Sequence, residues 1–297
     1  MSSCPLCKRV SEKDFFGLPN YYHCNNCSIA WQIFFLKSPY KESYYKGTSN
    51  FIHILFSPIS RLFYLIRERY VGKKNIGLWI DVGAGDGGLL KCIKAKEKIG
   101  VEISASGRRK MEEIGLKTLT DQEFLKVSGL NADVISFWHV LEHTQNPWMY
   151  LRSAYRNLAK GGTIVIGIPN FDSFEFKFFK KHWFHLDHRH HFWHFSSKSI
   201  NNVVIQEGFE IKKNDYWSLE HHLAGVLQSF INITSNSDNI LHRLVKRGED
   251  STRFSLKGAF CSIFWLTAGL PIVVTFLIIA SLSKKSGTMV VIAEKKA

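Results

Sequence analysis

The sequence predicts an α/β fold with an open, mostly parallel, Rossmann-like sheet, and two observations support that prediction. Short apolar runs alternate with helical periodicity from Leu78 to Trp217, which is the pattern of repeated βαβ units. The apolar run Leu78–Val82 also ends in a turn rich in glycine, Gly83-Ala-Gly-Asp-Gly-Gly88, that opens a helix. Glycines in such a turn let a ligand approach the backbone with no Cβ in the way.

The glycine turn fits two classes of cofactor. Gly83, Gly85 and Gly88 match the dinucleotide fingerprint G-x-G-x-x-G. Read from Asp81 to Gly87, the same stretch matches the D-x-G-x-G-x-G turn of S-adenosylmethionine (SAM) sites. The turn by itself does not separate the two cofactors.

Length and charge set the broad class of the protein. The 297 residues can form one domain of about 200–250 residues with attachments. A net charge of +14 indicates an anionic partner, such as nucleic acid, a phosphate-bearing substrate or a membrane surface. A generally basic surface is the alternative. The opening residues Met1-Ser-Ser-Cys-Pro5 lack the basic and apolar regions of a signal peptide, so we expect a cytoplasmic protein.

Four of the six cysteines stand in two C-x-x-C pairs. The pairs Cys4-Pro-Leu-Cys7 and Cys24-Asn-Asn-Cys27 are separated by 16 residues. This is the ligand spacing of a zinc ribbon with four cysteine ligands. Four thiolates close the coordination sphere, so the predicted zinc is structural. It would let residues 1–45 fold with almost no apolar core.

Helical spacing and apolar runs predict the elements around the glycine turn. Apolar residues recur at helical spacing over Phe51–Val71, with one interruption at Pro58. After the turn we expect a helix over Leu89–Lys96 and a second strand over Lys98–Ser104. A helix over 105–114 and a short strand over Leu116–Leu119 follow.

Two carboxylates stand where an adenosine ligand would need them. Glu102 ends the second strand, 21 residues beyond Asp81, and a carboxylate there accepts hydrogen bonds from ribose hydroxyls. Asp121 follows the third strand, where the adenine edge would lie.

The fourth and fifth strands complete the predicted parallel part of the sheet. The fourth is Ala132–Trp138, and a helix from Pro147 to Leu158 follows it. The fifth lies within Gly161–Asn170 and ends in a rigid Pro-Asn loop. Ligands of open α/β sheets collect at the carboxyl ends of the strands. The side chains expected at the mouth of the site are Trp138, His139, Glu142 and His143.

Asp81–Gly87, the acidic strand end at Glu102, Val140-Leu-Glu-His143, Gly161-Gly162 and Ile168-Pro-Asn170 together resemble the class I SAM-dependent methyltransferases. Within them the chain is similar to a family found in bacterial surface-polysaccharide gene clusters. Many members of that family begin with a C-x-x-C…C-x-x-C module followed by a proline and a Tyr-Tyr pair, here Pro39 and Tyr44-Tyr45. The resemblance covers residues 1–217 and resumes at 287–295.

This resemblance favours SAM over a nicotinamide cofactor, because a dehydrogenase would have no reason to carry the Leu-Glu-His and Pro-Asn loops in this order. It implies a seven-stranded methyltransferase sheet with helices on both faces, closed by a last strand over Thr288–Ala293. The cofactor-binding residues would be Asp81, Gly83, Gly85, Gly87, Glu102, Asp121 and Trp138.

The stretch from His182 to Ser196 holds six histidines in 13 residues. It resembles the family segment W-x-x-L-D-x-P-x-H-x-x-H-F-S, with Arg189 where the family usually has proline. Imidazole titrates near neutral pH, so one histidine can act as general base. The candidates, in order, are His191, His194 and His139. For each histidine a structural role, bonding loop carbonyls, is as well supported, and no ligand pattern favours a second metal.

An insertion over 218–286 separates the last two strands. Its part Gly258–Ser283 is a run of 26 residues without a charge, long enough to span a bilayer. Both flanking strands belong to one sheet, so both ends of the run must lie on one side of a membrane. Gly269-Leu-Pro271 near its middle can make a bend. We expect a re-entrant or interfacial helical hairpin that docks on the inner membrane face, and a buried hairpin or a dimer interface is the alternative.

These observations predict three parts: a zinc ribbon over 1–45, a SAM-binding domain over 46–217 and 287–297, and the helical insertion. The leading hypothesis is methyl transfer from SAM to an oxygen or carbon of a sugar or lipid-linked glycan at the membrane. An RNA methyltransferase is the first rival, because zinc ribbons and positive charge suit RNA; the uncharged run argues against it. A membrane-bound scaffold without catalysis is the second. The oligomeric state is not predicted.

Overall fold

The computed structural model describes residues 2–15, 18–32, 50–72, 75–188, 190–216, 219–236 and 256–296. Pro39, the pair Tyr44-Tyr45, Arg189 and Trp217, all named above, lie outside these ranges. The chain forms two compact units. The sheet unit comprises Ser49–Ile168, Ile200–Asp215 and Val290–Ala297, and the accessory unit comprises Met1–Thr48, Pro169–Ser199 and Tyr216–Met289.

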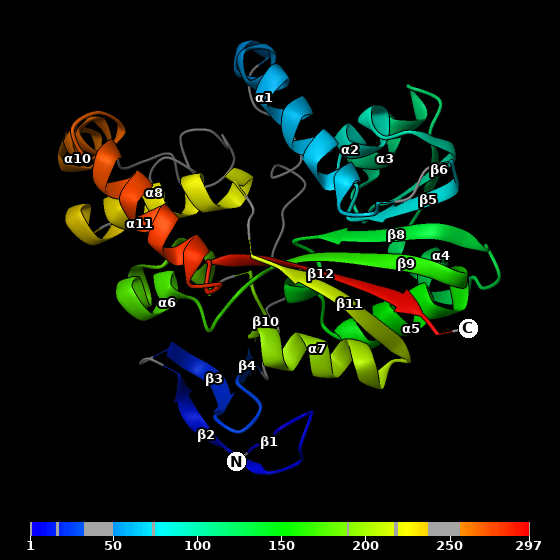
Figure 1. Ribbon diagram of the computed structural model, residues 1–297, viewed down its shortest axis with the longest axis horizontal. Coiled ribbons are helices and arrows are strands. Elements are labelled where there is room, and N and C mark those ends of the chain that lie inside the picture. The colour runs from blue at the N-terminus through cyan, green and yellow to red at the C-terminus, as the bar shows by residue number, and fades with distance from the viewer. Residues whose placement is uncertain are drawn as a thin grey trace. The chain divides into compact units, whose positions relative to one another are not determined.

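The sheet unit is built on seven strands in the order β11-β12-β9-β8-β5-β6-β7 (Figure 1). Their bounds are β5 Ile76–Val82, β6 Ala95–Val101, β7 Lys117–Leu119, β8 Ala132–Trp138, β9 Leu158–Pro169, β11 Phe209–Asp215 and β12 Thr288–Lys295. The pairs from β9 through β8, β5 and β6 to β7 are parallel, whereas β11 and β12 pair antiparallel. The predicted α/β class and seven-stranded sheet are confirmed.

Helices connect these strands, and local signals fix several of their ends. The helices are α1 Asn50–Arg69, α2 Gly88–Cys92, α3 Ala105–Glu112, α4 Asp121–Lys126, α5 Pro147–Asn157 and α7 Ser197–Gln206, with a 3₁₀ turn, η2, over Leu141–His143. A capping box between Thr120 and Glu123 begins α4. The Asn146 side chain caps α5, whose first residue is Pro147. Buried apolar side chains, including Trp79, Leu90 and Met111, form the core.

One boundary differs clearly from the sequence prediction. The helix predicted over Leu89–Lys96 ends at Cys92, and β6 already begins at Ala95 instead of Lys98. Ala, Lys and Glu favour helices when isolated, but here Ile76 pairs with Ala95, so hydrogen bonding to β5 extends the strand. β6 therefore ends at Val101, and Glu102 is the first residue beyond it.

The accessory unit contains a second, antiparallel sheet of five strands, in the order β1-β2-β3-β4-β10. Their bounds are β1 Ser2–Ser3, β2 Val10–Phe15, β3 Leu18–Cys24, β4 Ile29–Gln32 and β10 Trp193–Phe195. The first four strands form the N-terminal module, and the last comes from the histidine-rich stretch. The sequence predicted only a loop there.

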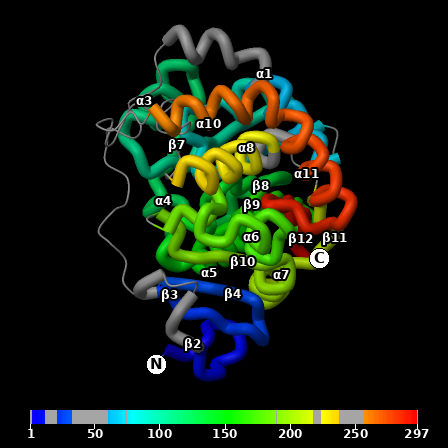
Figure 2. The backbone as a smooth tube through the Cα atoms, turned by 90° about the vertical axis from the view of Figure 1, so that its left-hand side faces the viewer, coloured from blue at the N-terminus to red at the C-terminus, as the bar shows by residue number. Residues whose placement is uncertain are grey.

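Helices and an aromatic core make up the rest of the accessory unit. The helical elements are α6 Phe174–Phe179, η3 Lys180–His182, η4 Phe184–Leu186, α8 Leu219–Ser235, α10 Leu256–Leu266 and α11 Leu270–Leu282. Aromatic side chains from α6, α8, α10 and α11 pack together; Phe230, for example, stacks on Trp265 at 4.3 Å between ring centroids. Figure 2 shows α8 running beside α10.

The predicted uncharged run forms two helices with a break after Leu266. The axes of α10 and α11 are bent by 67° at this break, which contains Gly269 just before Pro271. Among the described residues, no single helix is both long and apolar enough to cross a membrane, whereas the bent pair together meets that test of length and composition.

The division into three parts stays a prediction. The two compact units of the structure differ from it in one respect. Residues Pro169–Ser199 group with the N-terminal module and the insertion and not with the large sheet. The physical reason is the pairing of β10 with β4 together with the shared aromatic core, which includes Tyr21, Phe176 and Phe230.

Candidate functional site

The glycine turn after β5 has the backbone that only glycine adopts readily. Gly83, Gly85 and Gly87 have φ angles of 76°, 59° and 79°. A Cβ on Gly83 would lie 2.3 Å from a methyl group of Val140, so this glycine allows close packing against the loop after β8. A Cβ on Gly85 would meet nothing within 4 Å. Gly85 therefore presents bare backbone to open space, as a ligand cradle requires.

Glu102 holds this turn from the neighbouring strand. Its Oε2 accepts a hydrogen bond from the Gly85 amide at 2.8 Å, and its Oε1 accepts one from the Ser104 amide at 2.9 Å. The side chain is buried, and burial raises the pKa of Glu102 even though both amide bonds lower it. Each carboxylate oxygen keeps a second lone pair, so the group can also accept from ribose hydroxyls.

Asp81 lies in a buried polar chain within β5 and β8. The Ser136 hydroxyl donates to its Oδ1 at 2.6 Å, and the Trp79 indole N–H donates to Ser136 at 2.8 Å. Burial raises the pKa of Asp81 to about 7, although the Ser136 bond and the positive charge of Arg67 act in the opposite direction. This carboxyl is therefore poised to ionise when a cation binds beside it.

Asp121 begins α4, after β7. The Tyr150 hydroxyl of α5 donates to its Oδ2 at 2.6 Å. Burial raises the pKa of Asp121, while the Tyr150 bond and the charge of Arg108 lower it. The tyrosine fixes the carboxylate, which can still accept from an adenine amino group.

Helix α1 supplies two residues that sequence reasoning missed. The Arg67 guanidinium lies 4.7 Å from the ring of Trp138, a cation–π distance. The Tyr64 hydroxyl lies so close to Gly88 that a Cβ there would come within 2.5 Å of it. The sequence pattern could have indicated this pair, because positions 64 and 67 share one face of the predicted helix.

His139 follows β8 directly and pairs with a buried carboxylate. Its φ of 55° is unusual for a residue other than glycine. Its Nδ1 lies 3.2 Å from Oε1 of Glu142, which is 1% exposed. The next residue, Val140, contacts Gly83, so the pair stands beside the glycine turn. A histidine oriented by a carboxylate is the arrangement of a general base.

The other two predicted histidines belong to the accessory unit. His194 lies in β10 opposite Ala30, and its ring packs against Tyr21 at 5.3 Å between centroids. His191 precedes this strand, and its ring is 5.8 Å from that of His194. Both side chains are buried, and their role as bases stays a prediction.

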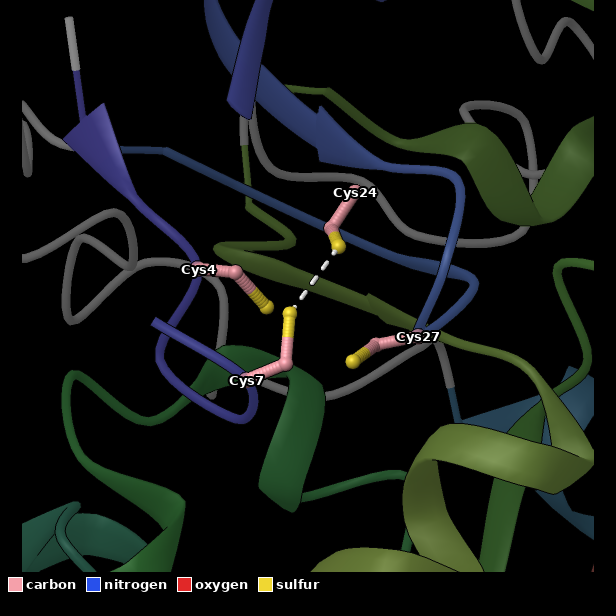
Figure 3. A group of neighbouring side chains, drawn as sticks. All are labelled: Cys4, Cys7, Cys24 and Cys27. Atoms are coloured by element: carbon pink, nitrogen blue, oxygen red, sulfur yellow. Dashed lines mark hydrogen bonds between the residues drawn. The ribbon is translucent and has the colours of Figure 1, made fainter. Parts of the chain in front are cut away.

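The four predicted metal ligands converge in the N-terminal module (Figure 3). Their sulfur atoms all lie within 4.8 Å of one another, with Cys7 and Cys24 at 3.6 Å. Tetrahedral zinc–thiolate bonds would place sulfurs about 3.8 Å apart. Burial, and after it the neighbouring thiols, raise the pKa of the Cys27 thiol to about 12. A divalent cation would relieve the repulsion between the thiolates, so the four cysteines fit a metal centre.

A cavity of about 740 Å³ opens elsewhere in the sheet unit. Its lining includes Arg69, Lys94 and Lys96, at the amino ends of β5 and β6. Ligands of this sheet type bind at the carboxyl ends, where Gly85 and Glu102 lie. The glycine turn therefore stays the predicted cofactor site.

An open sheet with this strand order, a glycine cradle and a carboxylate after the second strand defines a class I, SAM-dependent methyltransferase fold. Residues 51–214 match the family model described as methyltransferase domain. This match covers more than half of the 297 residues, so the chain belongs to that family. Family membership and fold thus agree on a methyltransferase domain of the class I type.

Two solved structures share the fold. One belongs to the complex between the Haloferax volcanii Trm112 methyltransferase activator and a methyltransferase; it covers 87% of this chain and 100% of its own, with TM-score 0.52 and 10% identity. The other is Haemonchus contortus phosphoethanolamine N-methyltransferase 2 in complex with SAM, which covers 79% of this chain and 52% of its own, with TM-score 0.51 and 13% identity. These identities support the shared fold alone.

A curated relative, an uncharacterized protein of Methanocaldococcus jannaschii, is 32% identical over 115 residues. The match covers 38% of this chain and 54% of that protein, so the chain spans about half the length of the curated relative it matches.

Proposed function

We propose that this methyltransferase transfers the methyl group of SAM to a sugar or lipid-linked glycan at the cytoplasmic face of a membrane. The observation that carries the choice of acceptor is the exposed apolar surface of α10 and α11. It contains Leu256, Phe260, Ile263, Phe264, Leu266, Leu270, Ile272, Val274, Ile278, Ile279 and Leu282. So many exposed apolar side chains on two successive helices favour contact with a membrane or a lipid-bearing partner.

The surroundings of this surface suit an anionic membrane. Phe174 and Phe178 of α6 are partly exposed, and both rings contact Phe276 of α11. Lys284 and Lys285 follow Ser283, the C-cap of α11, and both are exposed. Lysines beside an interfacial apolar surface attract anionic headgroups. A lipid-linked acceptor would be held at this surface, whereas RNA binding gives no reason to expose it.

On the donor side, bound SAM supplies an electrophilic sulfonium methyl group. Glu102 would accept hydrogen bonds from its ribose, and Asp121 would meet its adenine. Gly85 leaves room for the ligand against the backbone. Asp81 places a carboxylate where it can stabilise positive charge. Methyl transfer is an in-line displacement, so these residues act by alignment and by excluding water.

Of the three predicted histidines, we propose His139 as the general base. With Nδ1–H donated to Glu142, the lone pair lies on Nε2. Nε2 would then take the proton of an acceptor hydroxyl while bound SAM supplies the methyl group. For a carbon acceptor the same nitrogen would remove a proton beside a carbonyl group.

The assignment of the base is tested with His139→Ala. We expect turnover of labelled SAM to fall by about 10²–10⁴-fold, while SAM affinity measured by calorimetry stays the same. The matched control is His190→Ala. The Nδ1 atom of His190 lies 2.7 Å from a carboxylate oxygen of Asp187, and these two residues are three positions apart, as His139 and Glu142 are. Full turnover in His139→Ala would remove this residue from the mechanism.

The acceptor class is tested by incubating the protein with labelled SAM and either bacterial lipid extract or total RNA. We expect label in the glycolipid fraction. Label in RNA would support the rival RNA methyltransferase, which the net charge of +14 favours. Absence of SAM binding by folded protein would instead support the scaffold without catalysis.

Membrane docking is tested by flotation with liposomes containing anionic lipid. The variant Phe260→Ser, Ile263→Ser removes two exposed apolar side chains of α10 and should float much less than the unchanged protein. The control is Ile205→Ser on α7, since Ile205 is 50% exposed but lies outside the α10–α11 surface. Equal flotation of all three proteins would contradict docking through α10.

A further inference from the structure

The sheet that bears the cysteines takes its edge strand from a distant part of the chain. β10 pairs antiparallel with β4, and the register sets Trp193 opposite Trp31 and Phe195 opposite Ile29. β10 belongs to the histidine-rich stretch. More than 160 residues separate the two partners in sequence, so this pairing ties the stretch to the N-terminal module.

Side chains of the N-terminal module extend the same attachment. The Tyr21 hydroxyl donates to the carbonyl oxygen of His191 at 2.5 Å. The Gln32 side-chain amide donates to the carbonyl oxygen of His188 at 2.6 Å, and the Gln32 backbone amide donates to that of Phe192 at 2.9 Å. All three acceptors are main-chain carbonyls. The module therefore holds the backbone at residue 188 and over residues 191–195.

Two of the cysteines lie at the turn of the hairpin that makes this attachment. Cys24 is the last residue of β3 and pairs with Ile29, the first residue of β4. Cys27 lies in the turn between these strands. A metal bound by both residues would hold this turn closed and thereby fix β4.

In the described part of the N-terminal module, few apolar side chains are buried around this hairpin, and two of them, Tyr21 and Ala30, belong to the aromatic core of the accessory unit. Among its residues with described side chains, the buried apolar ones besides the cysteines are Tyr21, Ile29, Ala30 and Trp31. Metal ligation by the four cysteines would therefore add to the stability of this hairpin.

We infer that the four-cysteine centre, acting through β4, positions the histidine-rich segment His188–Phe195, and that Tyr21 and Gln32 are the positioning residues. Metal binding and the conformation of this segment are then linked. The inference stands apart from the proposed acceptor, because it requires neither a glycan nor a membrane.

The first test is amide hydrogen exchange of the full-length, zinc-loaded protein before and after removal of zinc by a chelator. We expect exchange of peptides covering β4 and β10 to become at least tenfold faster, while peptides covering β5 and β8 stay protected. Unchanged protection of β10 would overturn the inference. Loss of protection throughout β5 and β8 as well would overturn a local role of the metal.

The second test keeps the metal and cuts the attachment, with the double variant Tyr21→Phe, Gln32→Ala. We expect one zinc per chain, unchanged SAM affinity and faster exchange over residues 188–195. Tyr22→Phe is the control, because neighbouring residues of a strand point to opposite faces. A double variant that exchanges at the unchanged rate would overturn the roles of Tyr21 and Gln32.

Discussion

The amide of Gly85 donates a hydrogen bond of 2.8 Å to the carboxylate of Glu102. The residue that follows β6 therefore also fixes the turn that follows β5. The carboxylate is thus part of the cradle as well as the proposed ligand for the cofactor ribose. Loss of its charge should affect the shape of the turn and the ribose contact together.

Glu102→Gln should weaken SAM binding by about 10–100-fold, because a hydrogen bond to a charged group contributes about 1.5–3 kcal/mol. Isothermal calorimetry measures the effect. Asp133→Asn is the matched control. Asp133 accepts hydrogen bonds from the amides of Gly77 and Leu78, at the amino end of β5, the strand that leads into the glycine turn. An equal loss of affinity in both variants would mean that general damage to β5 is responsible.

Gly85→Ala should abolish SAM binding and leave the protein folded. The new methyl group would occupy the open space that the ligand needs, and the positive φ adds about 1 kcal/mol of strain. Gly129→Ala carries the same backbone cost, with φ of 79° and open space around it, but lies before β8 at its amino end. It should lose similar stability and keep its SAM affinity. SAM binding by Gly85→Ala would contradict the assignment of the cradle.

SAM affinity should rise with pH through about 7. Burial raises the pKa of Asp81 to about 7, and a cationic ligand binds the ionised carboxylate better. Below pH 7 the affinity should fall by up to about tenfold for each pH unit. Calorimetry between pH 6 and pH 8 measures this slope, and Asp81→Asn should flatten it. A flat profile in the unchanged protein would show that Asp81 does not respond to the cofactor.

Glu175 should make the protein less stable as pH rises from about 4.5 to about 7. Burial in α6 raises the pKa of Glu175 from 4.5 to about 7, so in this interval the folded chain holds a proton that the unfolded chain has lost. The total loss is about 3 kcal/mol in the free energy of unfolding. Urea unfolding of Glu175→Gln at pH 5 and pH 8 should lack this loss. Glu97→Gln is the control, because Glu97 is exposed.

The fold class and the cofactor cradle could be predicted because their signals are local. Asp81 and the three glycines lie within one strand and one turn, so backbone requirements and sequence pattern coincide. Strand β6 was harder, since Ala95 to Lys98 favour a helix in isolation. Pairing of these residues with β5 overrides that preference, and no local pattern reveals it.

The pairing of β10 with β4 could not be predicted for a different reason. β10 has three residues and lies among histidines that read as a loop. Its partner strand stands far away in sequence, and contacts at such separation leave no periodic signal. The contact between Arg67 and Trp138 depends on how α1 meets the sheet, which the helix pattern also leaves open.

The antiparallel pair of β11 and β12 has a consequence for how the insertion is joined to the sheet. Asp215 lies opposite Val290, so the backbone leaves and re-enters the sheet at points about 5 Å apart. Some seventy residues therefore connect these two strands in place of a tight hairpin turn. For the seven-stranded sheet, this segment is topologically one long loop, and closing a loop of that length costs little more entropy than closing a shorter one. The helices within it are held instead by the aromatic core of the accessory unit, which includes Phe230 and Phe276.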